Sequence, residues 1–253
     1  MWCIVTLSKI MTEIKTASEI IYGINPIQEL LKAKRRKIYG IYTTRPTPKA
    51  FVKLEAEFKA RNIPIKYVSR DQLTRQAGTS EHQGIIALAS PFAYRSKPFD
   101  PARHSFLLLL DGIQDPRNLG AILRSAYCTG VDGVIITQKS SAPLNAVALK
   151  ASAGLAEHLE IMKSPSPVNT AQELKKNGYQ LYVAAFDGQN ILDTSFKLPM
   201  CIVIGSEGEG VSPSLIKLGT TITIPQKRAD ISYNASVAAG IILFYTATLQ
   251  KKI

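Results

Sequence analysis

The segment Leu110–Arg124, which reads LDGIQDPRNLGAILR, joins an apolar run to a helical pattern through a turn crowded with polar side chains. The apolar run 106–110 has the length of a strand, and Asp115-Pro116 is a dipeptide typical of turns. Beyond the turn, apolar residues recur at helical spacing. The segment therefore predicts a buried strand, a polar turn and a helix over 119–129.

Two polar residues of this segment, Asn118 and Arg124, are the first candidates for function. At about 100° per residue, Arg124 lies roughly 140° round the helix from Leu119 and so points away from the apolar stripe. A strand end that presents polar side chains beside a helix start is where open α/β sheets hold ligands. The alternative is an N-cap role for Asn118 and a solvated Arg124, and the segment alone leaves both open.

The chain beyond residue 104 alternates between apolar runs of strand length and segments with helical spacing. Such alternation predicts an α/β fold with a mostly parallel sheet that is covered on both faces. Strands are expected at 106–110, 133–137, 180–185, 201–205 and 221–224, and helices at 119–129, 145–152, 168–177, 212–218 and 235–249.

The first part of the chain predicts a second, smaller α/β unit. Asn25, Pro26 and Gln28 form a capping-box pattern with Asn25 as the N-cap of a helix. His82 precedes the last strand, and a hydrogen-bonded loop histidine is expected there rather than a catalytic one. Strands are expected at 38–43, 64–68 and 84–89, and a helix at 48–61.

The positive charge of the chain is unevenly distributed. The 253 residues carry a formal net charge of +12, and residues 1–100 hold 17 Lys and Arg against 8 Asp and Glu. This asymmetry favours a polyanionic partner bound by the N-terminal part, although a generally basic soluble protein would show it too. The basic cluster Lys34, Arg35, Arg36 and Lys37 ends a predicted helix, whose negative end it suits, and it is also expected to contact the phosphates of such a partner.

The three cysteines, Cys3, Cys128 and Cys201, are too few and too far apart for a disulfide framework or a zinc site. This pattern fits a reducing compartment, and a cytoplasmic protein without a metal is expected. Cys128 and Cys201 fall in a predicted helix and a predicted strand and are expected to be buried. The apolar start is a poor signal peptide, Met11 is a second possible start, and no run is long enough to span a membrane.

A glycine-rich turn follows the apolar run 201–204, in the stretch CIVIGSEGEG over 201–210. Its order is G-x-x-G-x-G, which is neither the dinucleotide fingerprint nor a phosphate loop. Glu207 and Glu209 would repel a phosphate but suit a cationic or hydroxyl-bearing ligand. The turn is therefore a candidate ligand site, with a tight structural turn as the alternative.

The last polar cluster, Ser232-Tyr233-Asn234-Ala235-Ser236, opens the final helix after the strand that ends at Ile224-Pro225. One polar residue would suffice as a cap, so three in five residues indicate a binding role as well. The helix over 235–249 is apolar over a wide arc, which is typical of a deeply buried helix or of a dimer interface.

Three motifs of the second half, taken in order, resemble those of the SPOUT superfamily, and within it those of the tRNA/rRNA 2′-O-ribose methyltransferases. Three motifs in the right order are far more specific than any one glycine loop. They are LDG, DPRNLG and the following Arg over 110–124, IGSEG over 204–208, and IP at 224–225 with SYNASVA over 232–238.

The resemblance extends upstream through Tyr22-Gly23-Ile24-Asn25-Pro26 and His82-Gln83-Gly84. These stretches look like the small, ribosomal-protein-like RNA-binding domain that precedes the catalytic domain in the ribosomal RNA branch of the family. Within that branch the likeness is greatest to enzymes that methylate a guanosine of 23S ribosomal RNA. The implied organisation is an N-terminal extension over 1–17, an RNA substrate-binding domain over 18–94, a linker over 95–103 and a catalytic domain over 104–253.

The resemblance also implies a cofactor, a fold and an assembly. S-adenosylmethionine would bind inside a C-terminal trefoil knot, held by Gly205, Ile224 and Tyr233 largely through backbone atoms, with Ser236 beside them. The active site would be completed across a homodimer formed by the catalytic domains. The residues at the family's catalytic positions are Asn118, Arg124, Glu207, Ser232 and Asn234.

One motif departs from the family's pattern. The stretch 226–231 replaces a shorter, glycine-containing approach to the Ser-x-Asn segment. Tyr233 and Ala235 stand where Leu and Val are common. Backbone contacts to the cofactor are expected to survive these changes, and side-chain contacts around the adenine to differ.

The expected mechanism is an in-line displacement at an already activated methyl group, so the enzyme mainly aligns the reactants and helps to remove the hydroxyl proton. Because an Arg side chain stays protonated in proteins, Arg124 would fix the target phosphate or stabilise the developing alkoxide. A phosphate oxygen or water would then accept the proton. Asn118 would orient Arg124 or the ribose, and Glu207 would pair with Arg124 or with the ligand. Ser232 and Asn234 would hydrogen-bond the ligand or a motif loop.

Two alternative functions remain at this point. The basic first domain would equally serve a non-catalytic RNA-binding or ribosome-assembly protein. The substrate could also be a tRNA or another ribosomal RNA position, because RNA selection depends on shape and on unstacked loops.

Overall fold

The computed structural model describes residues 18–228 and 231–253, which form two compact units. The first unit ends at Ala93 and the second runs from Tyr94 to Ile253. The domain boundaries given above stay a prediction, and the proposed N-terminal extension lies outside the described residues.

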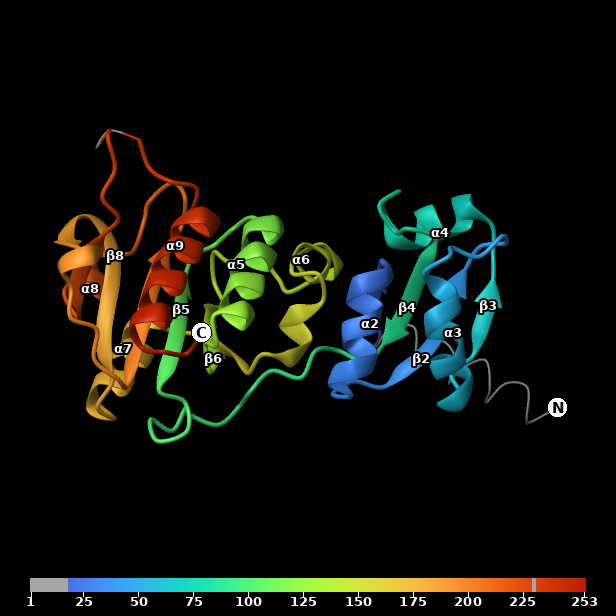
Figure 1. Ribbon diagram of the computed structural model, residues 1–253, viewed down its shortest axis with the longest axis horizontal. Coiled ribbons are helices and arrows are strands. Elements are labelled where there is room, and N and C mark those ends of the chain that lie inside the picture. The colour runs from blue at the N-terminus through green and yellow to red at the C-terminus, as the bar shows by residue number, and fades with distance from the viewer. Residues whose placement is uncertain (1–17, 229–230) are drawn as a thin grey trace. The chain divides into compact units, whose positions relative to one another are not determined.

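The first unit is a four-stranded sheet with the strand order β1-β4-β2-β3 (Figure 1). Strand β4 runs antiparallel to β1 and β2, and β3 runs parallel to β2. The three strands predicted here are confirmed, and β1 and α4 are additional. The strands are β1 (Glu19–Tyr22), β2 (Ile38–Thr43), β3 (Ile65–Tyr67) and β4 (Ile85–Ala89), and the helices are α2 (Ile24–Ala33), α3 (Phe51–Ala60) and α4 (Arg70–Ala77).

The N-cap predicted for α2 is wrong. The helix begins at Ile24 and its N-cap is Gly23, whose φ is 94°, so Asn25 lies inside the first turn. The chain must reverse directly after β1, and glycine adopts the required positive φ without steric cost. The capping acceptor comes from far along the chain, because the Ile24 amide donates to Gln83 Oε1 at 3.1 Å.

His82 is a structural loop residue, as predicted. Its side chain is fully buried. Nδ1 accepts a hydrogen bond from the Gly84 amide at 3.0 Å, and Nε2 lies 3.1 Å from Thr74 Oγ1. Burial, reinforced by the positive charge of Arg70, lowers the pKa of His82.

The second unit contains six parallel strands in the order β10-β8-β9-β5-β6-β7, which confirms the predicted α/β class. All five predicted strands and all five predicted helices are present, and β7 is additional. The strands are β5 (Phe106–Asp111), β6 (Gly133–Thr137), β7 (Ile161–Ser164), β8 (Gln180–Asn190), β9 (Met200–Gly205) and β10 (Thr220–Thr223). The helices are α5 (Pro116–Cys128), α6 (Ala146–Ala151), α7 (Pro167–Lys176), α8 (Pro213–Ile216) and α9 (Ala235–Leu249), with short 3₁₀ helices at Leu155–His158 and Ile191–Asp193.

Both faces of this sheet are covered. Leu107 and Leu109 of β5 belong to a core cluster with Leu174 of α7 and Leu215 of α8. Because side chains alternate along a strand, the equally buried Phe106, Leu108 and Leu110 face the other side. There α5 packs against α6 and α9 (Figure 1).

The segment predicted as a linker, 95–103, packs along the second unit. The Arg95 amide donates to the carbonyl of Ile161, the first residue of β7, at 2.7 Å. Phe99 is 3% exposed and fills the space over Gly133, where an added Cβ would come within 2.2 Å of its ring.

The two cysteines in the described residues have different environments. Cys201 is buried, as predicted, and burial raises the pKa of its thiol. Cys128 is exposed, which corrects the prediction, because it lies about 140° round α5 from the buried Leu123. Among the described helices, none is both long enough and apolar enough to cross a membrane.

Candidate active site

The polar turns singled out in the sequence meet at one edge of the parallel sheet. Strands β5 and β9 are neighbours and pair in register, with Asp111 opposite Gly205 at their carboxyl ends. The chain leaves β5 toward the start of α5 and leaves β9 into the glycine-rich turn. The segment that starts α9 follows β10 of the same parallel sheet, so this edge collects all three motifs.

The glycine-rich turn is a closed structure rather than a loose loop. Ser206 and Gly210 exchange two backbone hydrogen bonds of 3.1 Å, and Ser206 Oγ accepts from the Glu209 amide at 3.3 Å. Gly205 has no room for a side chain, because an added Cβ would lie 2.0 Å from the carbonyl carbon of Gly210. Gly208 is the opposite case, with nothing within 4 Å of an added Cβ.

Asp111 fixes the far end of this turn. Its Oδ2 atom accepts a hydrogen bond from the Ser212 amide at 2.9 Å, which ties the end of β5 to the residue before α8. From the sequence, Asp111 was singled out only as part of the LDG motif, and this contact was not predicted. The available signal was its position as the first polar residue after a buried strand.

Three of the predicted catalytic residues form one hydrogen-bonded chain. Asn118 Nδ2 donates to Glu207 Oε1, and Asn234 Nδ2 donates to Asn118 Oδ1 at 3.3 Å. Asn234 Oδ1 is the cap of α9 and accepts from both the amide and the hydroxyl of Ser236, at 2.9 and 2.6 Å. Motifs more than 80 residues apart are thus linked through side chains.

The alternative N-cap role of Asn118 does not hold. The N-cap of α5 is Asp115, whose carboxylate accepts from the Arg117 amide at 2.8 Å, and Pro116 occupies the first helical position. The amide of Asn118 is therefore engaged with the other two motifs instead of with its own helix.

A cavity of about 340 Å³ lies beside this chain of side chains. It has the size of a small-molecule site, and it combines apolar walls with the polar glycine-rich turn. Among the described residues, its lining includes the carboxylates of Glu207, Glu209 and Asp187 and no Lys or Arg, which suits a positively charged ligand. The predicted residues that line it are Gly205, Glu207, Ile224, Ser232 and Tyr233.

Two lining residues of β8, Phe186 and Asp187, were not predicted. The expected strand ended at 185, whereas β8 continues to Asn190 and pairs with β10 beyond a shift in register. Phe186 is 65% exposed at the cavity. The sequence offered one signal for them. The carboxyl ends of parallel strands lie at the same edge of a sheet, so residues at the end of β8 could have been expected beside the site.

Arg124 lies apart from these residues. It follows Asn118 by six positions on α5, which is about 240° round the helix, and it does not line the cavity. Its side chain is exposed, and within residues 18–228 and 231–253 it has no hydrogen-bond or ion-pair partner. Of the two partners expected for Glu207, Arg124 or the ligand, Arg124 does not contact it among these residues, and Glu207 pairs with Asn118 instead.

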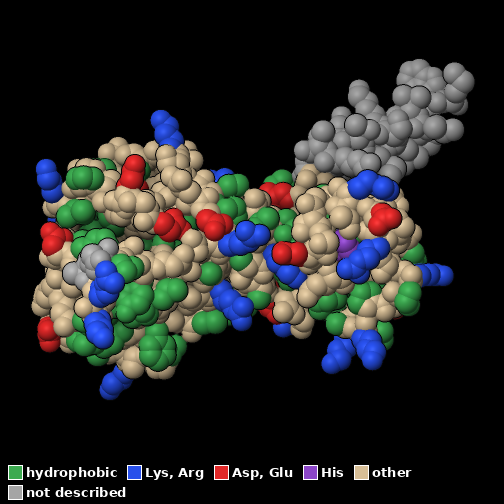
Figure 2. Space-filling model, turned by 90° about the horizontal axis from the view of Figure 1, so that it is seen from above, with side chains coloured by type: hydrophobic (Ala, Val, Ile, Leu, Met, Phe, Trp, Pro, Cys, Tyr) green, Lys and Arg blue, Asp and Glu red, His purple; other side chains and the backbone are tan. Residues whose placement is uncertain are grey.

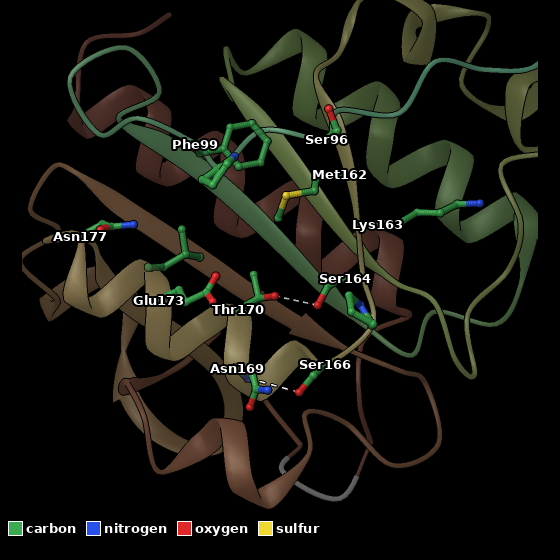
Figure 3. A pocket seen from close by; sticks show the side chains of 13 residues that line it. Ser96, Phe99, Met162, Lys163, Ser164, Ser166, Asn169, Thr170, Glu173 and Asn177 are labelled. Atoms are coloured by element: carbon green, nitrogen blue, oxygen red, sulfur yellow. Dashed lines mark hydrogen bonds between the residues drawn. The ribbon is translucent and has the colours of Figure 1, made fainter.

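A second cavity of about 330 Å³ lies between α7 and the segment 96–99 (Figure 3). Asn169 and Thr170 face it from α7, and they are hydrogen-bonded to Ser166 and Ser164. It contains none of the predicted site residues. The motifs therefore select the first cavity.

The predicted RNA-contacting cluster divides into exposed and buried members. Lys34, Arg35 and Lys37 are exposed. The side chain of Arg36 is 1% exposed, and it is held by Glu19 at 2.7 Å and by the Ser90 carbonyl at 2.7 Å. Arg36 therefore stabilises the first unit, which corrects its assignment as an RNA contact.

Comparison with known families assigns both units. The model of the SpoU rRNA Methylase family matches residues 105–244. The model described as RNA 2′-O ribose methyltransferase substrate binding matches residues 20–95.

Comparison with curated proteins finds relatives of nearly the same length. The chain is 34% identical to the 23S rRNA (guanosine-2′-O-)-methyltransferase RlmB of Yersinia pestis, over 90% of this chain and 96% of the relative. It is 30% identical to the putative TrmH family tRNA/rRNA methyltransferase YacO of Bacillus subtilis, over 89% of this chain and 94% of the relative.

The fold is shared with solved structures. The SpoU methyltransferase AviRb of Streptomyces viridochromogenes, in complex with AdoMet, superposes with a TM-score of 0.80 at 21% identity, covering 94% of this chain and 93% of that one. The A. aeolicus TrmH/SpoU tRNA modifying enzyme gives a TM-score of 0.54 at 25% identity, covering 62% of this chain and 78% of that one.

Proposed function

The chain belongs to the SpoU rRNA methylase family, and we propose that it methylates the ribose 2′-hydroxyl of a guanosine in 23S ribosomal RNA, with S-adenosylmethionine as donor. The observation that carries the proposal is the convergence of Asn118, Glu207 and Asn234 beside one carboxylate-lined cavity. The substrate follows the relatives that match over nearly their whole length. Such a substrate agrees with the cytoplasmic location expected from the cysteine content.

The residues around the cavity fit the cofactor. Gly205, Ile224 and Tyr233 would hold its adenosine part, with Ser236 positioned through the cap of α9. The carboxylates of the lining match the positive charge of a sulfonium group. When bound, the cofactor supplies an activated methyl group, and the proposal includes the C-terminal knot expected from the family.

The protein's own groups then align the ribose and handle its proton. Arg124 remains a cation and would bind the target phosphate or stabilise the alkoxide, and a phosphate oxygen or water would accept the proton. Asn118 is held between Glu207 and Asn234 and would orient the ribose or Arg124 from a fixed position. Such pre-set alignment is the main source of rate enhancement when the leaving group is already activated.

A homodimer would complete the site. Arg124 does not line the cavity of its own chain, whereas the face around it on α5 and α9 carries exposed apolar side chains that include Tyr127, Val237 and Phe244. Hydrophobic side chains gather on the second unit in Figure 2. Phe244 alone is 61% exposed, and burying such rings against a second copy is favourable. We therefore assign this face to the dimer and place Arg124 of the partner subunit at the cavity.

The first unit would bind the RNA. Its described residues, 18–93, carry 13 Lys and Arg against 6 Asp and Glu, and Figure 2 shows basic side chains on the face in view. Lys34, Arg35 and Lys37 are exposed and remain the expected phosphate contacts.

The test is to incubate the protein with S-adenosylmethionine and unmodified 23S ribosomal RNA, and to map 2′-O-methyl groups by primer extension. One new stop at a guanosine is expected. Methylation of tRNA alone would overturn the proposed substrate. Cofactor binding, seen as a raised thermal midpoint, without transfer to either RNA would favour the non-catalytic alternative.

A further inference from the structure

An exposed arginine lies on an exposed tyrosine at the edge of the first unit. The guanidinium of Arg45 lies over the ring of Tyr67, 4.2 Å from the ring centroid. Tyr67 is the last residue of β3, the edge strand of the sheet, and pairs with Thr43, two residues before Arg45. Tyr67 is 40% exposed, and Arg45 is exposed as well.

Arg45 differs from Arg36 and Arg61, two other arginines of this unit, whose side chains are held by the protein itself. Arg36 is bound by Glu19, and Arg61 is bound by Glu57 and by the Leu31 carbonyl at 2.8 Å. Within the described part of the chain, Arg45 has neither an ion pair nor a hydrogen bond, and its side chain lies against the Tyr67 ring. Its N–H donors are therefore available to a ligand.

The surroundings of this pair are also basic and aromatic. Lys66, which precedes Tyr67, lies 5.8 Å from the ring centroid of Tyr42 on the neighbouring strand. Arg70 is exposed at the start of α4, three residues beyond Tyr67. This edge of the sheet therefore presents aromatic rings and a guanidinium group next to further positively charged side chains.

We propose that Arg45 and Tyr67 form a stacking platform for one unpaired base of the RNA, an inference that rests on the proposed function and names where the first unit meets its substrate. A guanidinium plane that covers a tyrosine ring offers its other face to a base, and bases splayed out of RNA loops stack on such groups. Neighbouring cations attract the phosphates of the same strand. A paired base is already stacked within its helix, so the occupant is single-stranded RNA.

The test compares binding of a single-stranded RNA containing 2-aminopurine with binding of the same strand annealed to its complement. Stacking quenches the probe, so the wild-type protein should quench the single strand and leave the duplex unchanged. Arg45→Ala and Tyr67→Leu should each weaken single-strand binding about 10-fold, within the range measured for base stacking on side chains.

Three matched variants separate stacking from simple attraction. Arg45→Lys keeps the positive charge but loses the planar guanidinium group. Its affinity for the single strand should fall nearly as far as that of Arg45→Ala. Tyr67→Phe keeps the ring and should bind normally. Lys53→Ala removes one exposed charge from α3 and should change affinity little. Full binding by Arg45→Lys, or an equal loss in Lys53→Ala, would overturn the platform.

Folding and catalysis are controlled separately. An unchanged thermal midpoint of each variant shows that both units remain folded. Because quenching requires no methyl transfer, a protein that quenches only through Arg45 and Tyr67 but methylates no RNA would retain the platform and lose the proposed function. Methyl transfer to 23S RNA without any quenching would retain the proposed function and overturn the platform.

Discussion

Asn118 and Glu207 are hydrogen-bonded to each other, side chain to side chain, although 89 residues separate them in the sequence. The same Asn118 accepts from Asn234, so one amide joins the first helix turn of α5, the glycine-rich turn and the cap of α9. An amide held on both sides has little rotational freedom. Its role is therefore positional, and the partner that fixes it should matter to catalysis.

Replacing Glu207 tests this coupling. Glu207→Ala leaves the Asn118 amide without its charged acceptor, and a hydrogen bond to a charged group contributes about 1.5–3 kcal/mol. We expect kcat to fall roughly 10- to 100-fold, with a smaller loss in Glu207→Gln because Gln can still accept from Asn118. Steady-state kinetics of both variants provide the measurement, and a wild-type kcat for Glu207→Ala would contradict the positional role.

Two glycines of the same turn offer a matched comparison. Gly205→Ala would push a Cβ to 2.0 Å from the Gly210 backbone, so the turn must open and the cavity must change shape. Gly208→Ala meets nothing within 4 Å. Calorimetric titration with S-adenosylmethionine should show binding lost in the first variant and nearly unchanged in the second. Equal behaviour of the two would show that this turn does not shape the cofactor site.

Much of the second unit could be predicted because its local patterns are strong. The runs at 106–110 and 201–205 are continuous and apolar, as expected of strands buried on both faces. The strand β7 was missed because only Ile161 and Met162 are apolar before a lysine. No pattern of period two or of helical spacing can be read from so short an edge strand.

The parts that could not be predicted depend on contacts far along the chain. The cap of α2 comes from Gln83, 59 residues away, so a local capping-box pattern at Asn25 was misleading. Arg36 lies in a run of basic residues, yet its side chain is buried because it binds Glu19 and the Ser90 carbonyl. Which member of a charged run is buried is decided by tertiary packing and is not visible in the run itself.

The buried His82 should make folding depend on pH. Its pKa is lowered in the folded state, so the unfolded chain binds the proton more tightly. Stability is therefore fully present above the unfolded pKa of about 6.5 and is lost as pH falls below it. Protonation would place a hydrogen on Nδ1, which now accepts from the Gly84 amide.

Urea unfolding at pH 8 and at pH 5.5 provides the measurement. The free energy of unfolding should decrease toward pH 5.5, by at most about 1.4 kcal/mol per pH unit for a single proton. His82→Asn keeps an acceptor for Gly84 without a titrating group, so its stability should change less over the same interval. A parallel pH profile in the two proteins would exclude His82 as the cause.

Arg124 allows the proposed sharing of the active site between two subunits to be tested directly. Because its side chain is exposed and does not line the cavity of its own chain, Arg124→Ala should abolish methyl transfer while S-adenosylmethionine still binds. Gly205→Ala should fail for the opposite reason, since its cofactor cavity is damaged but its arginine is intact. In a mixed dimer of the two variants, one cavity is intact, and under the proposed arrangement the intact arginine of the other subunit would reach it.

Mixing the two inactive variants should therefore restore activity. With random exchange of subunits, about half of the dimers are mixed and each has one complete site, so activity should recover toward a quarter of the wild-type value. A tandem-tagged mixed dimer, purified before the assay, removes the uncertainty of exchange. If the mixed dimer stays inactive while wild-type dimers treated in the same way transfer methyl groups, Arg124 acts on the cavity of its own chain.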